Sequence, residues 1–244
     1  MLSSARINII LPVYNEESVL EKNINILKDY LSKILSFCNW QIIIADNNSK
    51  DQTAQISQEL AKQERIKYFF IPKKGRGLAL RRSFLENPSD YYVYMDIDLA
   101  TDLSALPDLI KYLTEEKYNL VTGSIFLPQS KITRSFLREI ISRGYILMVK
   151  TLLNTKLSDL QCGFKGLDQT IVKNIVSQTK DNEWFFDTEL MLLSERAGFK
   201  IKEMPITWVE VRNINRKSKV KLIISIYQFM NNLIKFKKNG SKRV

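Results

Sequence analysis

The segment YYVYMDIDLATD, residues 91 to 102, runs a series of apolar and aromatic residues into three aspartates, Asp96, Asp98 and Asp102. The apolar run predicts a buried strand, but an ionised carboxylate that is buried without a partner is far too costly to keep. The two acids that come first, Asp96 and Asp98, therefore either lie in water beyond the end of the strand or have a positive group between them.

Short β-branched runs alternate with segments of helical period around this strand, which predicts an α/β protein with a mostly parallel sheet flanked by helices. The first helix is expected at 15–35, with Asn15 as its N-cap. Strands are expected at 7–13, 40–46, 66–71, 91–96 and 120–126, and the other helices of this half at 50–64, 77–86 and 103–113. The region up to about residue 125 is thus Rossmann-like. Ligands of open parallel sheets bind beyond the carboxyl ends of the strands, where Asp46, Asp96 and Asp98 fall.

The later part of the sequence is less regular. It predicts a long helix at about 135–153, a helix near Asp187 with that residue as its N-cap, and an extended segment at 199–211. No internal repeat or low-complexity linker interrupts it, so we expect one domain at 1–215 followed by a basic amphipathic tail at 216–244.

Composition excludes several kinds of chemistry. The sequence has no histidine, which removes Ser-His-Asp triads, imidazole bases and histidine-ligated zinc. Cys38 and Cys162 are distant and outside any C-x-x-C, so neither a disulfide framework nor a zinc site is expected. The opening residues lack a basic leader and a long apolar run, which together with the cysteine pattern predicts a cytoplasmic protein.

The formal charge of +11 is concentrated in the tail, where ten Lys or Arg and no acid follow from Arg212 onward. The first 211 residues carry 27 basic and 26 acidic side chains, a balance of +1. A cationic tail suits an anionic membrane surface or a nucleic acid. Residues 220–236 are apolar except for one narrow polar stripe, which predicts an amphipathic helix. This helix lies in a membrane interface, or packs on its own domain or on a second copy.

Nucleic-acid binding is the main non-enzymatic alternative. The long apolar helix interrupts the basic run, no DNA- or RNA-binding motif is present, and the clustered acids would have no role. We therefore expect no nucleic acid as a partner.

The aspartate pair itself favours a metal site. Strand side chains repeat every second residue, so Asp96 and Asp98 can lie on the same side of the chain. Mg²⁺ and Mn²⁺ prefer oxygen ligands and are typically held by one or two carboxylates together with phosphate oxygens. The alternative is a solvated turn in which Thr101 or Asp102 caps the next helix.

A series of short motifs gives the pair a context. In order along the chain they are LPVYNEE (11–17), ADNNSKDQT (45–53), KGRGLALR (74–81), MDIDLATD (95–102), VTGS (121–124), DLQCGFKG (159–166), FFDTEL (185–190) and RKSK (216–219). Together they resemble the family 2 glycosyltransferases of GT-A fold, and within these the dolichyl-phosphate glucosyltransferases and mannose synthases. The resemblance covers nearly the whole chain.

The resemblance implies inverting transfer of a hexose from a nucleotide sugar to a polyprenyl phosphate, with Mg²⁺ or Mn²⁺, by a cytoplasmic enzyme peripheral on the membrane. Asp98, Arg138 and Glu189 would be the catalytic residues, Glu189 touching the sugar hydroxyls. The implied donor-binding residues are Pro12, Tyr14, Glu16, Asp46, Asn47, Lys74 and Asp96, with Asp96 and Asp98 at the metal. Those implied for the acceptor phosphate are Arg134, Arg138 and Lys219. For Arg76 a basic turn that opens a helix is at least as good an interpretation.

Three departures bear on the substrate. The family's acid before its GS or NS pair is Asn47 here, and the acid Asp46 precedes it. LAT after the aspartate pair and Ile125 after GS are closer to the glucosyltransferase branch, which favours UDP-glucose over GDP-mannose. The alternatives are a family 2 transferase acting on a glycan or small-molecule acceptor, and a catalytically silent nucleotide-sugar binder.

The absence of histidine agrees with a phosphate acceptor. A phosphate is already an anion at neutral pH, so no general base is needed to create the nucleophile. Alignment of the reactants and stabilisation of the leaving group by metal and cations remain as the enzyme's work.

Overall fold

A computed structural model describes residues 5–36, 38–133, 136–209 and 222–240, and within these ranges the side chains of 136–138, 222–228, 239 and 240 are not described. The described strands are β1 (Arg6–Val13), β2 (Asn39–Asp46), β3 (Ile66–Phe70), β4 (Tyr91–Met95), β5 (Leu120–Ser124), β6 (Lys131–Thr133), β7 (Phe164–Asp168), β8 (Ile201–Pro205) and β9 (Thr207–Val209). The helices are α1 (Leu20–Ile34), α2 (Thr53–Leu60), α3 (Arg76–Glu86), α4 (Leu106–Thr114), α5 (Phe136–Leu153), α6 (Gln169–Asn174), α7 (Phe186–Arg196) and α8 (Leu222–Gly240), with short 3₁₀ turns at Leu103–Ala105 and Val176–Gln178.

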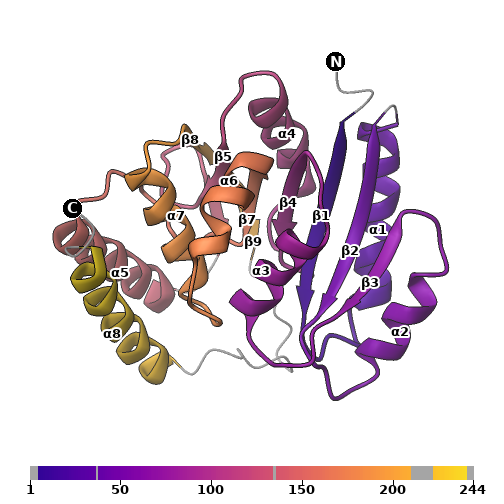
Figure 1. Ribbon diagram of the computed structural model, residues 1–244, viewed down its shortest axis with the longest axis horizontal. Coiled ribbons are helices and arrows are strands. Elements are labelled where there is room, and N and C mark those ends of the chain that lie inside the picture. Colours follow the sequence, from indigo (N-terminus) through magenta and orange to yellow (C-terminus); the bar gives the residue numbers. More distant parts are fainter. Residues whose placement is uncertain (1–4, 37, 134–135, 210–221, 241–244) are drawn as a thin grey trace.

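Among the described residues, seven strands form a central sheet in the order β3-β2-β1-β4-β7-β5-β8 (Figure 1). The strands β3, β2, β1 and β4 run parallel, as does the pair β5 and β8. β7 is antiparallel to both of its neighbours, β4 and β5. The predicted mostly parallel sheet flanked by helices is confirmed, and the inserted antiparallel strand is a feature that the alternation of segments did not predict.

Each face of the sheet packs against its own set of helices. On β1, Ile7 and Ile9 are buried in one apolar cluster with the inner stripe of α1 and with α4. Ile10 points the other way, into a second cluster that includes buried residues of α3, α5 and α7. Burial on both faces explains why the strand reads as a continuous apolar run instead of an alternating one.

The first helix begins later than its sequence predicted. α1 starts at Leu20, and the residue before it, Val19, provides no side-chain cap. Asn15 has a φ of 53°, in the left-handed region that asparagine tolerates, and its side-chain oxygen accepts the backbone N–H of Lys50. The prediction of Asn15 as an N-cap is therefore wrong, because the residue joins two loops and does not cap a helix.

The C-terminal helix packs on the domain that precedes it. Leu233 is 1% exposed, and Asn232 donates to the Asp181 carboxylate at 3.0 Å. The Phe229 ring lies 5.3 Å from that of Tyr145 on α5. Of the alternatives for this helix, packing on its own domain is the one that residues 229–236 adopt, and the boundary predicted at 215 lies outside the described residues.

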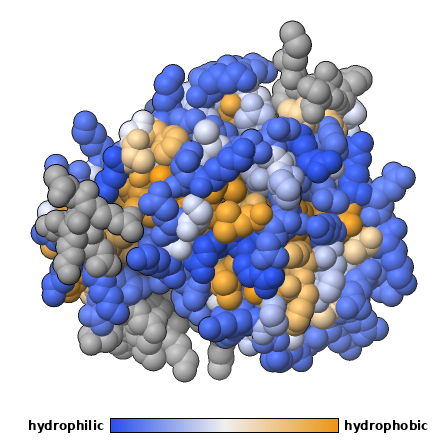
Figure 2. Space-filling model, viewed as in Figure 1, coloured by the Kyte–Doolittle hydropathy of each residue, from blue (hydrophilic) through white to orange (hydrophobic). Residues whose placement is uncertain are grey.

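A bilayer-spanning helix needs about 20 apolar residues. Within the described ranges, no helix has the length and the apolar character needed to cross a membrane. On the face drawn in Figure 2, hydrophobic residues form small patches separated by hydrophilic ones.

Candidate active site

The aspartate pair lies where the sequence predicted, at the carboxyl edge of the sheet. β4 ends at Met95, so Asp96 and Asp98 follow the strand directly, beside the end of its parallel neighbour β1. The Asp96 side chain is 47% exposed, and Asp98 is half-buried, with one carboxylate oxygen accepting the N–H of Ala100 at 3.2 Å. Both acids are thus presented beyond the strand and within reach of a ligand.

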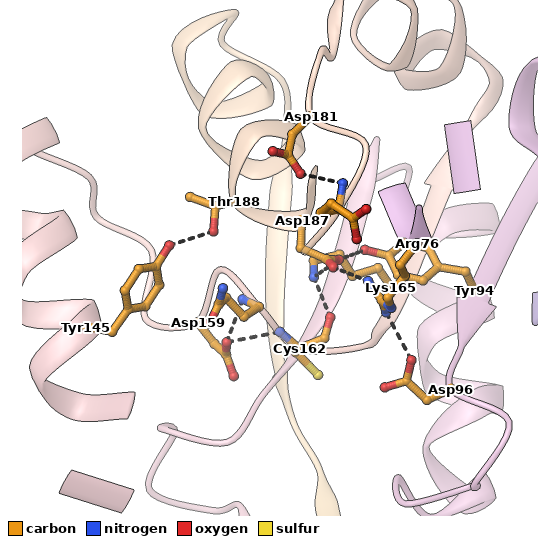
Figure 3. Close-up of polar contacts among 12 residues, drawn as sticks. Arg76, Tyr94, Asp96, Tyr145, Asp159, Cys162, Lys165, Asp181, Asp187 and Thr188 are labelled. Carbon is orange, nitrogen blue, oxygen red and sulfur yellow. Dashed lines mark hydrogen bonds and ion pairs between the residues drawn. The ribbon is translucent and has the colours of Figure 1, made fainter. Parts of the chain in front are cut away.

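A positive group does lie beside the pair, and it is Arg76. This residue opens α3, and its side chain is 9% exposed. One end lies 3.0 Å from Asp96 Oδ1, and the other donates to Asp187 Oδ2 (Figure 3). The sequence interpretation of Arg76 as part of a basic turn that opens a helix agrees with its place at the start of α3, and the structure adds that its side chain links two carboxylates.

Asp187 is the centre of a buried polar cluster. It lies inside α7, 3% exposed, and accepts from Lys165 Nζ at 3.0 Å and from the Tyr94 hydroxyl as well as from Arg76. Burial alone would raise the pKa of the Asp187 carboxyl, but the charges of Lys165 and Arg76 outweigh it and hold that pKa below its ordinary value. The prediction of Asp187 as an N-cap is wrong, because its partners are two buried cations and α7 has no side-chain cap.

The predicted donor residues lie around the adjacent strand ends. Pro12 and Tyr14 end β1 and begin the following loop, and the Lys74 ammonium sits 4.2 Å from the centre of the Tyr14 ring. Glu16 is 8% exposed, and its backbone N–H donates to Thr53 at 2.7 Å, which ties this loop to the start of α2. Tyr14 and Lys74, far apart in sequence, are therefore brought into contact.

Asp46 and Asn47 join the same group of loops. Asp46 is fully buried, and its two carboxylate oxygens accept the N–H of Ser49 and the hydroxyl of Tyr68. The Asn47 side-chain oxygen accepts the N–H of Gly75 at 2.7 Å, directly before Arg76. Both residues hold the loops after β2 and before α3 in place. Contact of either residue with a nucleotide base stays a prediction.

A cavity of about 200 Å³ opens on the other side of Asp96. It lies between α5 and the loop that leads into β7, and its lining includes Asp96, Phe126, Tyr145, Asp159, Gln161 and Trp208. The lining combines acidic and amide groups with aromatic rings, so the cavity can receive a ligand that has both a polar and an apolar part.

Asp159 shapes this cavity. It is 3% exposed, and one oxygen of its carboxylate accepts the backbone N–H groups of Gln161 and Cys162 (Figure 3). The other oxygen accepts the backbone N–H of Ile125. Burial raises the pKa of the Asp159 carboxyl. The same burial raises the pKa of the Cys162 thiol, which keeps this sulfur protonated and agrees with a structural role.

Glu189 holds a loop. One oxygen of its carboxylate accepts the N–H groups of Lys180 and Asp181, both at 2.8 Å, and burial raises the pKa of this carboxyl. Contact with a sugar stays a prediction. Of the predicted acceptor residues, Arg138 lies on α5 with its side chain outside the described set, and Arg134 and Lys219 lie outside the described residues altogether.

The two carboxylates at the end of β4, Asp96 and Asp98, are suitable ligands for a divalent cation. Among the residues that the structure describes, no cluster of three or more acidic or cysteine side chains could hold a metal alone. Two accessible carboxylates in one loop are nevertheless what Mg²⁺ or Mn²⁺ uses when phosphate oxygens complete the ligand set.

Arg76, Lys165 and Asp187 are the site residues that the sequence analysis did not assign. A partial signal was available, because Lys165 follows a phenylalanine in FKGLD and Asp187 follows two phenylalanines in FFDTEL. Opposite charges in two segments that both read as buried predict a pair.

The sequence of the chain matches a known protein family. The family model described as Glycosyl transferase family 2 matches residues 8–176. Glycosyltransferase AglD of Haloferax volcanii is 33% identical over 208 residues, which cover 84% of this chain and 33% of that protein.

Two relatives are named dolichyl-phosphate beta-glucosyltransferase. The one from Dictyostelium discoideum is 31% identical over 219 residues, and the one from Saccharomyces cerevisiae is 28% identical over 229 residues. Each alignment covers 84% of this chain and 67% of the relative. The chain thus spans about two thirds of these proteins and about a third of the Haloferax protein.

Solved structures agree on the fold. Glucosyl-3-phosphoglycerate synthase from Mycobacterium tuberculosis in complex with UDP has a TM-score of 0.67 at 19% identity, covering 96% of this chain and 80% of that one. The same synthase with Mn²⁺, UDP and glucosyl-3-phosphoglycerate has a TM-score of 0.66 at 17% identity, covering 94% and 77%. The predicted GT-A fold is confirmed, and at this identity the likeness concerns the fold alone.

Proposed function

The chain belongs to glycosyl transferase family 2, and from that premise we propose that it transfers a hexose, with inversion, from a nucleotide sugar to a polyprenyl phosphate of the dolichyl type. The observation that carries this proposal is the similarity to the dolichyl-phosphate beta-glucosyltransferases, which extends over 84% of the chain. Glucose from UDP-glucose is the favoured donor, and mannose from GDP-mannose is the second. Inversion of an α-linked nucleotide sugar would give the β product that those names contain.

On the donor side, the proposal assigns the nucleotide to the loops that Pro12, Tyr14, Glu16 and Lys74 form, with Asp46 or Asn47 near the base. The contact between Tyr14 and Lys74 supports this assignment, because it places a cation beside an aromatic ring at the strand ends. Asp96 and Asp98 would hold Mg²⁺ or Mn²⁺. A bound divalent cation supplies charge stabilisation to the leaving diphosphate.

On the acceptor side, the proposal assigns the lipid phosphate to the cavity beside Asp96. This cavity reaches α5, the helix that carries Arg138, and the lining rings of Phe126 and Tyr145 suit the first part of a prenyl chain. Arg138, Arg134 and Lys219 are the proposed cations for the acceptor phosphate. Glu189 is proposed to act at the sugar.

In the proposed reaction, an oxygen of the acceptor phosphate attacks the anomeric carbon of the sugar. The bond from that carbon to the diphosphate breaks, and the diphosphate leaves with the electron pair. The attacking oxygen carries no proton at neutral pH, so the step needs no base from the protein. The chain has no histidine, and its buried Asp159 carboxylate already accepts three backbone N–H groups. Neither is needed, because the transfer step requires no base.

A polyprenyl phosphate resides in a membrane, and we propose that the protein works at the cytoplasmic face of that membrane. Two exposed apolar residues of α5, Ile140 and Leu147, support this, as do Ile234 and the exposed Lys235 of α8, the helix packed beside α5. Exposed apolar side chains with neighbouring lysines suit an interface with anionic lipid.

The test is a transfer assay that offers UDP-glucose and GDP-mannose separately, with a polyprenyl phosphate, Mg²⁺ or Mn²⁺, and a chelator control. We expect chelator-sensitive formation of a glycolipid from UDP-glucose. Metal-dependent hydrolysis of the donor without a glycolipid would refute the lipid acceptor, and 3-phosphoglycerate and an oligosaccharide in parallel reactions would then test the acceptor alternatives.

A single variant separates the enzyme from a silent binder. Arg138→Ala is expected to lose transfer and to retain binding of the nucleotide sugar, because the proposed role of Arg138 is at the acceptor. An inactive wild-type protein that still binds UDP-glucose would contradict the enzymatic proposal.

A further inference from the structure

We propose that Arg76 is a positioning residue that fixes the orientation of the Asp96 carboxylate for its ligand, using buried Asp187 as the anchor. This inference rests on the proposed function, in which the ligand at Asp96 is a divalent cation bound to a nucleotide diphosphate. It gives a role to a side chain outside the aspartate pair, and the evidence for it is geometric.

The guanidinium of Arg76 has one fixed end and one end at the site. Its NH1 group donates to Asp187, whose side chain is 3% exposed, and its NH2 group lies 3.0 Å from Asp96 Oδ1, on a side chain 47% exposed. Figure 3 shows the guanidinium between these two carboxylates. Because only Asp96 is accessible, a ligand meets the outer carboxylate while the inner one stays with the arginine.

Asp187 is a suitable anchor because further contacts hold it. Lys165 Nζ, on a side chain that is 0% exposed, lies 3.0 Å from its second oxygen, and the buried Tyr94 hydroxyl donates to the same oxygen. Lys165 and Tyr94 come from the paired strands β7 and β4, and Asp187 comes from α7. Movement of Asp187 would therefore break contacts to two strands of the sheet as well as to Arg76.

The other oxygen of Asp96 is confined by the main chain at Gly163. A Cβ atom added to Gly163 would lie 2.2 Å from Asp96 Oδ2 and 2.8 Å from its Cγ, so the residue before β7 must be glycine for this carboxylate to stay where it is. Asp96 is thus held on one side by Arg76 and approached on the other by Gly163. A carboxylate oriented in advance needs less reorganisation when a ligand binds.

The charges of the cluster agree with an anionic ligand. Arg76 and Lys165 together balance the two carboxylates of Asp187 and Asp96, so the charge of Asp96 is compensated from behind. A diphosphate brought to Asp96 by a cation therefore does not meet an uncompensated negative charge on that residue. Lysine at position 76 would keep the charge but could not bridge two carboxylates with a planar fork.

The test is calorimetric titration of UDP, and in parallel GDP, into the full-length protein, with Mn²⁺ and with EDTA. Arg76→Gln and Gly163→Ala are expected to weaken Mn²⁺-dependent nucleotide binding by about 10–100-fold, the usual effect of losing a group that orients a metal ligand. Binding in EDTA should change little, because the contacts to the nucleotide remain. Arg76→Lys should fall between Arg76→Gln and the wild type.

The matched control is Arg82→Gln, on the same helix, where the arginine pairs with Glu86 at the surface. It should bind as the wild type does. If Arg76→Gln folds and binds the nucleotide with Mn²⁺ as the wild type does, the inference is overturned and the proposed function stands. If Arg76→Gln does not fold, wild-type binding by Arg76→Lys has the same meaning. Unchanged binding in Gly163→Ala would equally overturn the pre-set orientation of Asp96. A wild-type protein whose nucleotide binding does not respond to Mn²⁺ would overturn the proposed function together with this inference.

Discussion

Replacing Asp187 with asparagine removes the buried carboxylate that, among the described residues, pairs with both Arg76 and Lys165. The substitution keeps the shape of the side chain, so a change in stability reports the charge and its hydrogen bonds. Lys165 is 0% exposed and Arg76 is 9% exposed, so water cannot take over the role of the lost carboxylate. Arg76 would then keep the half-exposed Asp96, and Lys165 would keep the Cys162 carbonyl and the nearby charge of Asp159.

The size of the effect follows from this burial. Removing one partner of a buried ion pair costs about 3–5 kcal/mol, because the remaining charge is left uncompensated. Lys165→Met should cost less, about 1–3 kcal/mol, because it leaves only the Cys162 carbonyl without its donor. In that variant Asp187 keeps Arg76 and the Tyr94 hydroxyl. The loss of unfolding free energy is therefore expected to be clearly larger for Asp187→Asn than for Lys165→Met.

Urea unfolding followed by circular dichroism at neutral pH measures both free energies, and thermal unfolding should show a decrease of about 6–20 °C for Asp187→Asn. Arg82→Gln, which breaks an exposed pair, is the control and should cost less than about 1 kcal/mol. A loss for Lys165→Met equal to or larger than that for Asp187→Asn would refute the assignment of Asp187 as the neutralising centre of the cluster.

Four further outcomes are expected. Asp98→Ala should abolish transfer and leave the far-ultraviolet spectrum unchanged; full turnover with metal still required would contradict its place at the cation. Leu233→Ala should lower the unfolding free energy by about 2–5 kcal/mol, since the side chain is 1% exposed; no loss in urea unfolding would mean that α8 does not pack on the domain in solution. Because the pKa of Asp187 lies below its ordinary 3.8, the stability it contributes is complete above that value and is lost as the pH falls through the lower folded pKa. The difference in unfolding free energy between wild type and Asp187→Asn should therefore shrink below about pH 4, and a constant difference would contradict this. Gly77→Ala should destabilise by about 1–3 kcal/mol, since its added Cβ would lie 2.6 Å from the nearest side chain, whereas Gly144→Ala, with nothing within 4 Å, should not; equal stability of the two would refute the close packing at Gly77.

Much of the sheet could be predicted from the sequence because several of its parallel strands have a sequence pattern that is local to the strand. β1, β2 and β4 are each a short apolar run with a helix-forming segment after it, and burial on both faces makes the run continuous. β7 is different, because FKGLD carries a lysine and a glycine and is followed by a short helix. Its position between β4 and β5 depends on pairing with strands distant in sequence, which no local pattern contains.

The residues of the candidate site likewise fall into those that a local sequence pattern predicts and those that depend on the fold. Asp96 and Asp98 follow a strand, and the rule that ligands meet the carboxyl ends of strands is enough to place them. The partners of Arg76 lie 20 and 111 residues away along the chain, and only the folded sheet brings them together. Interpretations of Asn15 and Asp187 as helix caps failed because each residue has a stronger partner elsewhere in the fold, in one case a backbone N–H of another loop and in the other two buried cations.

The antiparallel strand β7 also sets the order in which a growing chain can complete its sheet. The strands β3, β2, β1 and β4 lie on one side of it and are all synthesised before residue 96, so they can assemble on one another as they leave the ribosome. β5 is made next but pairs with β7 and β8, so its first partner strand is not complete until the chain has reached Asp168. During that interval the outer edge of β4 and both edges of β5 are open to other chains. We therefore expect nascent chains of this intermediate length to need chaperones most, and slowing translation beyond residue 125 should increase their aggregation.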